Sequence, residues 1–411
     1  MKRQTSSTLW SLSLPLCVLA LLCLPALSSA SWFRLQSERE EKGGDLPFED
    51  RCETEKWMAK EEARMGLMER SMMPSSLSPS MMNSTSRALF EELKARIEAH
   101  SNNHLSHKRQ RQDDDDDDDD GGNAEQLLAS LPEIYVPLSY HIMKREDGSG
   151  DIPNQWVFDQ TDALNEAFKD LNIHFSTSSI DRWSNDVWAK CDFDDPTFED
   201  MTERISVNPG RHVQIYACRE KGVLGGAFLP QSFGGNEIDP RFGLYVHSHS
   251  LPGGCKGRYN EGDTVIHEMG HYFGLQHTFY KDGECDREGD GISDTPTEKG
   301  PHYGPCPGGP GPNWDSCPQK GYDPVDNFMN YSDDVCLNRF TTEQKAFMLL
   351  TLMQAKRRLL LNRAPVPQAA KSFPDIDPNF ADPCSDVNDS GGDSILRPHS
   401  LLTTLLYLLF A

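Results

Sequence analysis

The chain has 411 residues, with 40 Lys and Arg against 64 Asp and Glu, which gives a formal net charge of −24. This length exceeds that of one ordinary domain and the composition of both ends is biased, so we expect a folded domain between segments removed during maturation. The acidic balance argues against nucleic acid as a partner, because nucleic-acid surfaces select basic side chains.

The N-terminus carries the pattern of a secretory signal. Two basic residues next to Met1 precede the apolar run Leu9–Leu27, and small residues follow it up to Ala30. This order predicts a signal peptide over residues 1–30, and hence a secreted protein. A membrane-spanning anchor is the alternative.

Residues 31–112 are rich in Ser, Met and Glu and are most simply a propeptide. One amphipathic helix is predicted at Arg87–His100, and the cluster Lys108–Arg111 that follows it contains a basic cleavage site. The apolar stripe of this helix has helical spacing and consists of Leu89, Phe90, Leu93 and Ile97.

Eight consecutive aspartates, Asp113–Asp120, and two glycines form a segment over residues 113–122. Like charges at this density repel each other and keep a chain extended, which predicts a solvated linker. The alternative is a cation-binding or docking role, which would make the chain an acidic, cation-binding surface protein. The confinement of the run to one linker argues against that reading.

The main domain is predicted over residues 123–365, where strand and helix patterns alternate. Apolar residues alternate over 134–142 as in a half-buried strand, and helical spacing follows Asp159. The helix is marked by Leu164, Phe168 and Leu171, and two further strands are marked by Val213–Ala217 and Leu244–Val246.

The stretch from His267 to His277 fits the zinc-peptidase pattern H-E-x-x-H-x-x-G-x-x-H at every fixed position. On a helix, His267 and His271 project from one face, where both imidazoles can reach a single Zn²⁺ ion. Gly274 can take the left-handed conformation that ends a helix, so that the chain turns and brings His277 to the same metal. The pattern therefore predicts one zinc ion per chain with three histidine ligands.

Three histidine ligands leave one position of a zinc ion open to water. Zinc acidifies such a water molecule, and Glu268, beside a ligand, is placed to take its proton. The segment Asn327–Tyr331 has the form of the methionine-containing turn expected below this kind of site, with Met329 at its centre. A bare H-E-x-x-H also occurs by chance on amphipathic helices, but the third histidine and this turn argue against chance.

The segment after the zinc motif is rich in Gly, Pro and Cys, which predicts an irregular half of the domain. Thr341 and Gln344 form a capping-box pattern, so a final helix is predicted to begin there and to run to about Leu361.

Acidic residues around Gly291 are spaced like the ligands of a calcium loop, although Thr297 stands where a closing glutamate would be expected. The segment is therefore not an EF-hand. It either binds calcium or forms a solvated acidic turn. Its candidate ligands are Asp286, Glu288, Asp290 and Asp294.

Residues 366–392 are predicted to be a linker, and residues 393–411 have the pattern of a glycolipid-anchor signal. The small residues Ser390–Gly392 are followed by a polar spacer and by the apolar tail Leu401–Ala411. This order predicts removal of the tail and attachment of a glycolipid anchor at the cell surface. The tail is too short for a transmembrane helix, which needs about 20 residues, and a tail docked on the domain is the other alternative.

These motifs resemble those of the metzincin clan of zinc peptidases and, within it, the pappalysin family, which includes many secreted fungal and bacterial metalloproteinases. The zinc motif, the segment Gly291–Pro296 and the segment Asn327–Asp334 occur there in similar form. The resemblance covers roughly residues 130–360. Asn330 departs from it, because the family often has Asp at this position of the turn.

The resemblance implies an α+β fold, in which a twisted mixed sheet and the active-site helix lie above an irregular, disulfide-bridged lower subdomain. It also implies structural calcium near the acidic segment. Tyr331 is implied to donate a hydrogen bond to the oxyanion of the transition state, and a core tyrosine is the alternative. A five-residue segment resembles the family's edge strand, along which an extended substrate would pair, and a plain turn is the alternative. This segment consists of Leu224, Gly225, Gly226, Ala227 and Phe228.

The cysteines that follow the signal peptide are disulfide candidates, because the chain is predicted to be secreted. The resemblance implies two bridges in the irregular half, whereas the sequence alone allows three pairings of the four cysteines there. The implied bridges join Cys285 to Cys317 and Cys306 to Cys336. Cys191, Cys218 and Cys255 are an odd set, so one thiol is either free or paired with Cys52 or Cys384.

Cys52 is flanked by Arg51 and Glu53 and resembles the Arg-Cys segments of metzincin propeptides. A thiolate is a good zinc ligand and would fill the open position, which would keep the precursor inactive. Glu53 departs from the pattern, since such switches commonly have Gly there. A disulfide at Cys52 is the competing interpretation.

The sequence therefore predicts a secreted or surface-anchored zinc-dependent endopeptidase that hydrolyses peptide bonds in extracellular proteins. The alternative is a catalytically idle metzincin-fold surface protein that only binds its partners, and the intact Glu268 argues against it. Glycans are predicted at the sequons of Asn83 and Asn388, and none at the sequon of Asn330, which is expected to lie below the zinc ion.

Overall fold

The computed structural model describes residues 82–110, 131, 133–191, 196–219, 223–230, 232, 236, 238–279, 285, 289–353 and 384. All of them belong to one compact unit over residues 48–388. The signal peptide, the aspartate run and the anchor signal lie outside these residues. None of the described helices combines the length and the apolar character that a membrane span requires.

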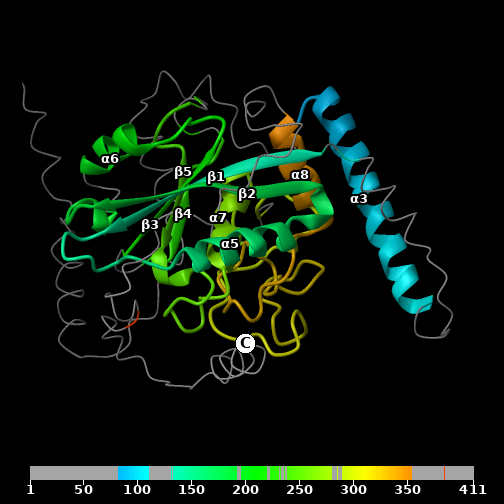
Figure 1. Cartoon of the computed structure of the whole chain (residues 1–411). Helices are drawn as coiled ribbons and strands as arrows, with labels where there is room; N and C mark the ends of the chain where they lie inside the picture. The colour runs from blue at the N-terminus through cyan, green and yellow to red at the C-terminus, as the bar shows by residue number, and fades with distance from the viewer. Residues whose placement is uncertain are drawn as a thin grey trace, which may run out of the picture. The chain divides into compact units, whose positions relative to one another are not determined.

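A five-stranded mixed sheet organises the domain, as predicted (Figure 1). Its spatial order is β2-β1-β3-β5-β4, and only β4, at one edge, runs antiparallel to its neighbour. The strands are β1 (Ile134–Lys144), β2 (Ile173–Ser184), β3 (Val213–Cys218), β4 (Gly225–Ala227) and β5 (Gly243–His247).

Strand β1 is buried along both faces, so the prediction of a half-buried strand was wrong. The reason is that helices cover both faces of the sheet. Leu138 and Tyr140 join the large core formed with α5 (Asn154–Ala167) and α7 (Asp263–Tyr272), while Met143 joins a second core on the other face with α6 (Thr197–Ile205).

Helix α5 begins at Asn154, directly after Pro153, and therefore five residues before Asp159, after which the helix was predicted. It is followed by the short 3₁₀ helix η2, which contains the predicted marker Leu171. Strand β2 was not predicted from the sequence, because after Phe175 its residues are largely polar. The 3₁₀ helices of the described residues include η2 (Lys169–Leu171), η3 (Trp188–Lys190) and η5 (Ser248–Ser250).

Helix α8 (Thr342–Met353) begins at the predicted capping box. The Thr341 N–H donates to Gln344 Oε1 at 2.8 Å, and the Gln344 N–H donates to Thr341 Oγ1 at 3.2 Å. These bonds satisfy two amide groups that a helix leaves without intrahelical acceptors.

Helix α3 (Ser84–Gln110) contains the helix predicted at 87–100 and extends beyond both of its ends. Phe90, Leu93 and Ile97 are buried in the same core as the sheet. The helix lies along α8 at the side of the domain (Figure 1).

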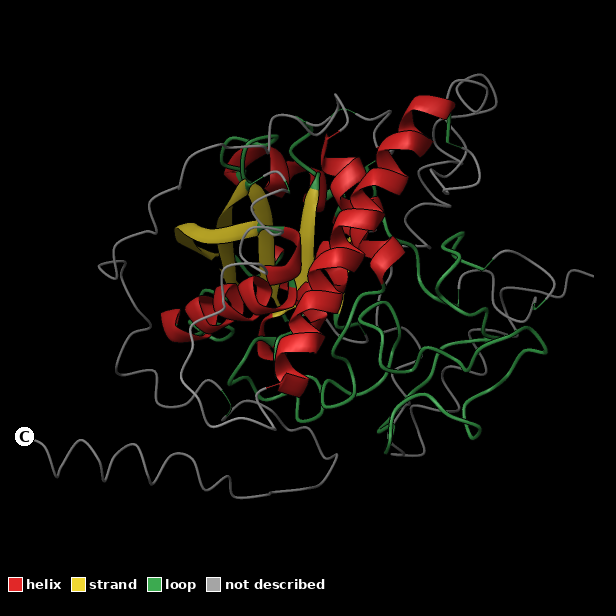
Figure 2. Cartoon of the chain, turned by 90° about the vertical axis from the view of Figure 1, so that its right-hand side faces the viewer, coloured by secondary structure: helices red, strands yellow, loops and turns green. Residues whose placement is uncertain are grey.

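The chain between α7 and α8 is irregular in its described part, as predicted from its Gly and Pro content. Figure 2 shows the strands in one half of the molecule and most of this loop structure in the other. All eight described cysteines are paired. The resemblance implied two of the bonds, Cys285–Cys317 and Cys306–Cys336, and the structure adds Cys191–Cys218 and Cys255–Cys384, which the sequence left open.

Candidate metal centre and substrate cleft

The structure brings His267, His271 and His277 together at the end of α7. Their Nε2 atoms lie 3.1 Å (267 to 271), 3.0 Å (271 to 277) and 3.2 Å (267 to 277) from one another. All three side chains are buried, and among the described residues they form the one cluster of ligand-type side chains close enough to hold a metal ion.

In two of these histidines, the hydrogen bond made by Nδ1 defines the tautomer. The Nδ1 atom of His267 donates to the carbonyl of Phe328 at 2.7 Å, and Nδ1 of His271 donates to the carbonyl of Leu275 at 2.7 Å. With the proton on Nδ1, the Nε2 atom of a neutral imidazole carries a lone pair. Burial, and then the neighbouring His277, lower the pKa of His271 well below its usual value, which favours this neutral form.

The three Nε2 atoms converge on one point, and a cation placed there would bind the lone pairs of the neutral rings. Nitrogen ligands of a tetrahedral zinc ion at 2.0–2.1 Å lie about 3.3–3.4 Å apart, close to the spacing of the three Nε2 atoms. The donor type, the tautomers and the spacing therefore fit a zinc ion.

Gly274 makes the turn that brings in His277. Its φ angle is +105°, in the left-handed region, and its N–H donates to the His271 carbonyl at 2.8 Å. A Cβ atom at this position would also lie 3.1 Å from Thr351 Oγ1 and 3.2 Å from a ring carbon of Phe347. Both the backbone angle and the packing against α8 therefore favour glycine.

Glu268 is fully buried beside strand β4. A Cβ atom on Gly225 would lie 2.8 Å from Glu268 Oε1 and 2.9 Å from its Cγ. The backbone of the sheet edge thus passes directly against the side chain proposed as the base. The sequence placed Gly225 in the edge segment but gave no sign of this approach.

Met329 packs under α7. It is fully buried, and a Cβ atom on Gly270 would lie only 2.5 Å from its sulfur. The Met329 carbonyl accepts from the N–H of Thr278 at 3.4 Å, next to the third histidine. The methionine turn therefore contacts both segments that carry the histidines.

Asn330 links this turn to a buried carboxylate that sequence reasoning missed. Its Nδ2 donates to both oxygens of Glu298, at 2.9 and 3.0 Å, and its Oδ1 accepts from the N–H groups of Tyr331 and His302. Burial raises the pKa of Glu298 to about 8, although hydrogen bonds from Thr278 and Asn330 oppose this shift. Glu298 follows the Gly291–Pro296 segment closely, but only the fold brings it to the turn.

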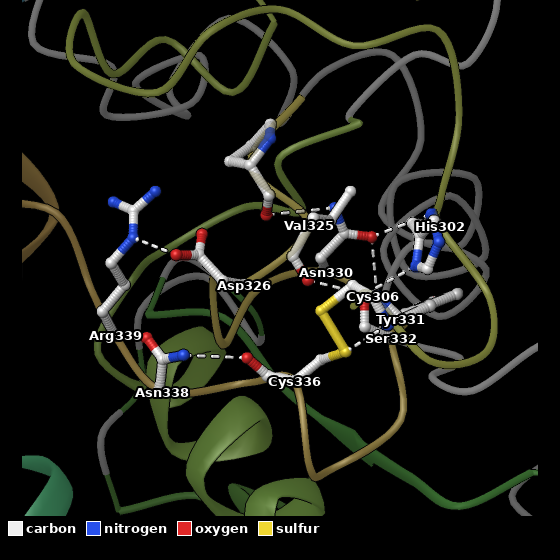
Figure 3. Close-up of a disulfide and its surroundings, with 11 residues drawn as sticks. His302, Cys306, Val325, Asp326, Asn330, Tyr331, Ser332, Cys336, Asn338 and Arg339 are labelled. Carbon is white, nitrogen blue, oxygen red and sulfur yellow. Dashed lines mark hydrogen bonds and ion pairs between the residues drawn. A yellow bond between two sulfur atoms is a disulfide. The ribbon is translucent and has the colours of Figure 1, made fainter. Parts of the chain in front are cut away.

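The lower half holds the other side of the turn through Ser332 and a disulfide (Figure 3). The Ser332 hydroxyl donates to the Val325 carbonyl at 2.6 Å and lies 2.9 Å from Nδ1 of His302. The Cys306–Cys336 bond closes the same loop region. The turn is therefore cross-linked to the irregular subdomain that carries it.

Tyr331 is buried and faces the histidines. Its Oη lies 3.3 Å from Nε2 of His277, and its ring packs on Phe279, which in turn stacks on the His277 ring at 4.6 Å between centroids. The ring of Tyr303, whose side chain is 45% exposed, lies 5.8 Å from that of Tyr331. A row of aromatic rings thus runs from the third histidine to the surface.

The acidic candidates for calcium do not all face one point. Asp290 is buried, its Oδ1 accepts from Thr295 Oγ1 and the Ile292 N–H, and burial raises its pKa to about 8. Asp294 instead accepts from Thr341 Oγ1 and the Glu343 N–H at the start of α8. Asp286, Glu288 and the proposed switch Cys52 lie outside the described residues.

Residues 248–353 match the peptidase family M43 model, described as "Pregnancy-associated plasma protein-A". The chain is 36% identical over 228 residues to an extracellular metalloprotease of Colletotrichum graminicola, which covers 54% of this chain and 77% of that protein. It is 35% identical over 217 residues to extracellular metalloprotease 1 of Coccidioides posadasii, covering 51% and 74%. Mature mirolysin of Tannerella forsythia, solved with a cleaved peptide, is similar at a TM-score of 0.46 and 24% identity, covering 56% and 95%.

Proposed function

Since the chain belongs to the pappalysin-type metzincins and is a secreted zinc metalloendopeptidase, we propose that His267, His271 and His277 hold its zinc ion and that Glu268 is its general base. The ligand assignment rests on the convergence of the three buried Nε2 atoms. In two of these rings, the other nitrogen, Nδ1, donates a hydrogen bond to a backbone carbonyl. The assignment of Glu268 rests on the motif and on its burial beside the histidines and β4.

A zinc ion held by these three histidines would act as a Lewis acid towards the scissile carbonyl and would lower the pKa of a water molecule to about 7. The Glu268 carboxylate takes the proton of that water and returns it to the leaving amine. The Tyr331 hydroxyl, beside His277, donates a hydrogen bond to the oxygen of the scissile carbonyl as negative charge develops on it.

The substrate is a peptide in extended form that pairs with the outer edge of β4. Among the described strands, β4 is at the edge of the sheet and pairs with β5 alone, so a peptide added as a further strand would align next to β4. The approach of Gly225 to Glu268 would place a peptide paired there beside the base.

Latency through Cys52 is a further part of the proposal. All eight described cysteines form disulfides with one another, so the competing interpretation, a disulfide at Cys52, has no partner among them. The unprocessed Cys52→Ser precursor is expected to be active. A mutant precursor as inactive as the wild-type precursor would leave Cys52 without this role.

Maturation is proposed to remove residues 1–30, to cut after the propeptide 31–112 and to leave the linker 113–122 before the catalytic domain 123–365. The linker 366–392 would then carry a glycolipid in place of residues 393–411. An anchor-cutting phospholipase is expected to release the protein from cells. Detection of the peptide Leu401–Ala411 in the mature protein would contradict this anchoring.

A structural calcium ion near Asp290 is proposed on the buried position of that carboxylate and on the acidic spacing around it. Binding is expected to raise the thermal midpoint of the zinc-loaded protein as calcium is added, with a stabilisation that grows as RT ln(1 + c/Kd), where c is the free calcium concentration. If the thermal midpoint does not change up to millimolar calcium, the proposed calcium site is wrong.

Asn83 and Asn388 are proposed as glycosylation sites, whereas the side-chain amide of the buried Asn330 donates to Glu298 within the turn region.

Digestion of a peptide library with the processed domain tests the function and reads out specificity together. Cleavage is expected with wild-type protein, to stop on removal of zinc and to return when zinc is added back. A folded domain with one zinc ion that cleaves no peptide would instead support the catalytically idle binding protein.

A further inference from the structure

Helix α3 contributes side chains to the core of the catalytic domain. Phe90, Leu93 and Ile97 are between 0% and 3% exposed and share one cluster with residues of β1, α5, α7 and α8. They lie at helical spacing on one face, while Glu91, Glu92 and Ala95 are exposed. The helix is therefore held like a core helix of the domain and not like a segment resting on its surface.

Lys94 adds a charge contact next to this apolar face. Its Nζ bonds to Oε1 of Glu343, a side chain that is 6% exposed, and the other carboxylate oxygen of Glu343 accepts from the N–H and hydroxyl of Ser293. Burial raises the pKa of Glu343, but the hydrogen bonds from Lys94 and Ser293 outweigh it and hold the pKa below its usual value.

A second carboxylate, that of Asp294, lies next to the ion pair of Lys94 and Glu343. Its carboxylate accepts from the Glu343 N–H and from Thr341 Oγ1, so two carboxylates lie close together at the start of α8. Burial and the charge of Glu343 raise the pKa of Asp294, and Lys94 opposes this shift. Lys94 thus places a cation next to two neighbouring carboxylates in this partly buried position.

The helix also packs on the domain away from the proposed substrate edge. It packs against α8 and η2, and η2 leads directly into β2. Strand β2 is at one edge of the sheet and β4, beside Glu268, is at the other (Figure 1). The presence of α3 is therefore compatible with substrate binding along β4.

We propose that α3 remains bound to the catalytic domain after cleavage at Lys108–Arg111, so that the mature enzyme is a nicked, two-chain protein. This inference rests on the proposed processing at that cluster. The cluster begins eleven residues after Ile97, so a cut there breaks none of the contacts made by Phe90, Leu93, Lys94 and Ile97. Release of the helix would expose three apolar side chains and leave Glu343 and Asp294 without Lys94.

The test uses the full secreted precursor with an affinity tag placed after residue 30, in the Glu268→Ala background so that self-digestion does not occur. A trypsin-like protease cuts the protein at Lys108–Arg111, and the products are separated by size exclusion under native conditions. Both fragments are expected in one peak at a one-to-one ratio. A tagged fragment that elutes alone, while the catalytic fragment keeps its thermal transition, would overturn the proposal.

Two matched variants identify the contact. Leu93→Asp puts a carboxylate into the core and is expected to release the tagged fragment after the cut, whereas Ala95→Asp puts the same group on the exposed face and is expected to retain it. Lys94→Ala keeps the apolar face and is expected to speed release by about tenfold, since a buried carboxylate loses its partner. Equal retention by Leu93→Asp and wild type would show that α3 is held by other residues.

The natural cut is located separately, by sequencing the N-termini of the mature secreted protein. Both the Lys108–Arg111 product and a second N-terminus between Cys52 and Ser84 are expected, because the proposed switch residue Cys52 must leave the active enzyme. If sequencing finds the cut elsewhere, the processing proposal fails, while the added protease still reports whether the helix stays bound.

Discussion

The sulfur of Met329 and the backbone of Gly270 are in direct contact, and a Cβ atom on Gly270 would come within 2.5 Å of that sulfur. Gly270 directly precedes the second histidine of α7, and Met329 is fully buried in the turn below. A position that the zinc motif leaves free is therefore restricted to glycine by a contact with a segment 59 residues away in the chain.

Gly270→Ala is expected to displace either Met329 or the helix that carries the histidines. Overpacking of this kind costs about 1–3 kcal/mol, so the thermal midpoint and the zinc affinity should both fall. Gly300→Ala is the control, because nothing lies within 4 Å of a Cβ atom there. Met329→Ala should cost less stability in the Gly270→Ala background than in the wild type, because it removes the clashing sulfur, and equal costs would mean that this contact is not the cause.

Gly225→Ala is expected to affect catalysis more than folding. The new methyl group would meet Glu268 Oε1 at 2.8 Å and the Tyr245 carbonyl at 2.9 Å, so the carboxylate must move. Since a misplaced base loses much of the 10²–10⁴-fold effect of proton transfer, kcat should fall by at least about tenfold. Zinc content should stay at one ion per chain. A variant with wild-type kcat would show that the contact with Gly225 does not determine the position of the base.

Asn330→Asp tests the link between the turn and Glu298. The Asn330 amide donates to both oxygens of that buried side chain, and at a pH above about 8, where Glu298 is ionised, an aspartate would place two carboxylates against each other. The loss of the donor and the repulsion should lower the free energy of unfolding by about 1–3 kcal/mol. Denaturant unfolding is the measurement.

The double variant Glu298→Gln with Asn330→Asp exchanges the two groups and restores an amide next to a carboxylate. Its free energy of unfolding is expected to exceed that of Asn330→Asp alone. Glu298→Gln is also made alone, and its effect on the free energy of unfolding is compared with its effect in the Asn330→Asp background. If the two effects are equal, the two side chains act independently and the proposed coupling is wrong.

Local patterns were enough to predict the features that depend on neighbouring residues. The helical spacing of His267 and His271, the left-handed Gly274 and the capping box at Thr341 all depend on residues within a few positions of one another. The mixed sheet was anticipated through the family resemblance. The helix at 87–100 was found from the spacing of its apolar residues.

The remaining features depend on long-range packing, for which the sequence carries no local signal. Gly225 meets Glu268, and Glu298 meets Asn330, only because the sheet edge and the irregular half converge on α7. The amphipathic pattern of α3 identified its buried face but not α8, the surface on which it packs. Strand β2 was missed because its paired neighbour, not its own composition, determines its conformation.

The most direct test of the account compares zinc content and peptide hydrolysis in Glu268→Ala and His277→Ala, measured on the same preparations. Glu268→Ala is expected to retain one zinc ion per chain and the wild-type thermal midpoint while hydrolysis is lost, because the base is removed and the three ligands remain. His277→Ala is expected to lose both zinc and activity. Near wild-type hydrolysis in Glu268→Ala, or one tightly bound zinc ion in His277→Ala, would contradict the account.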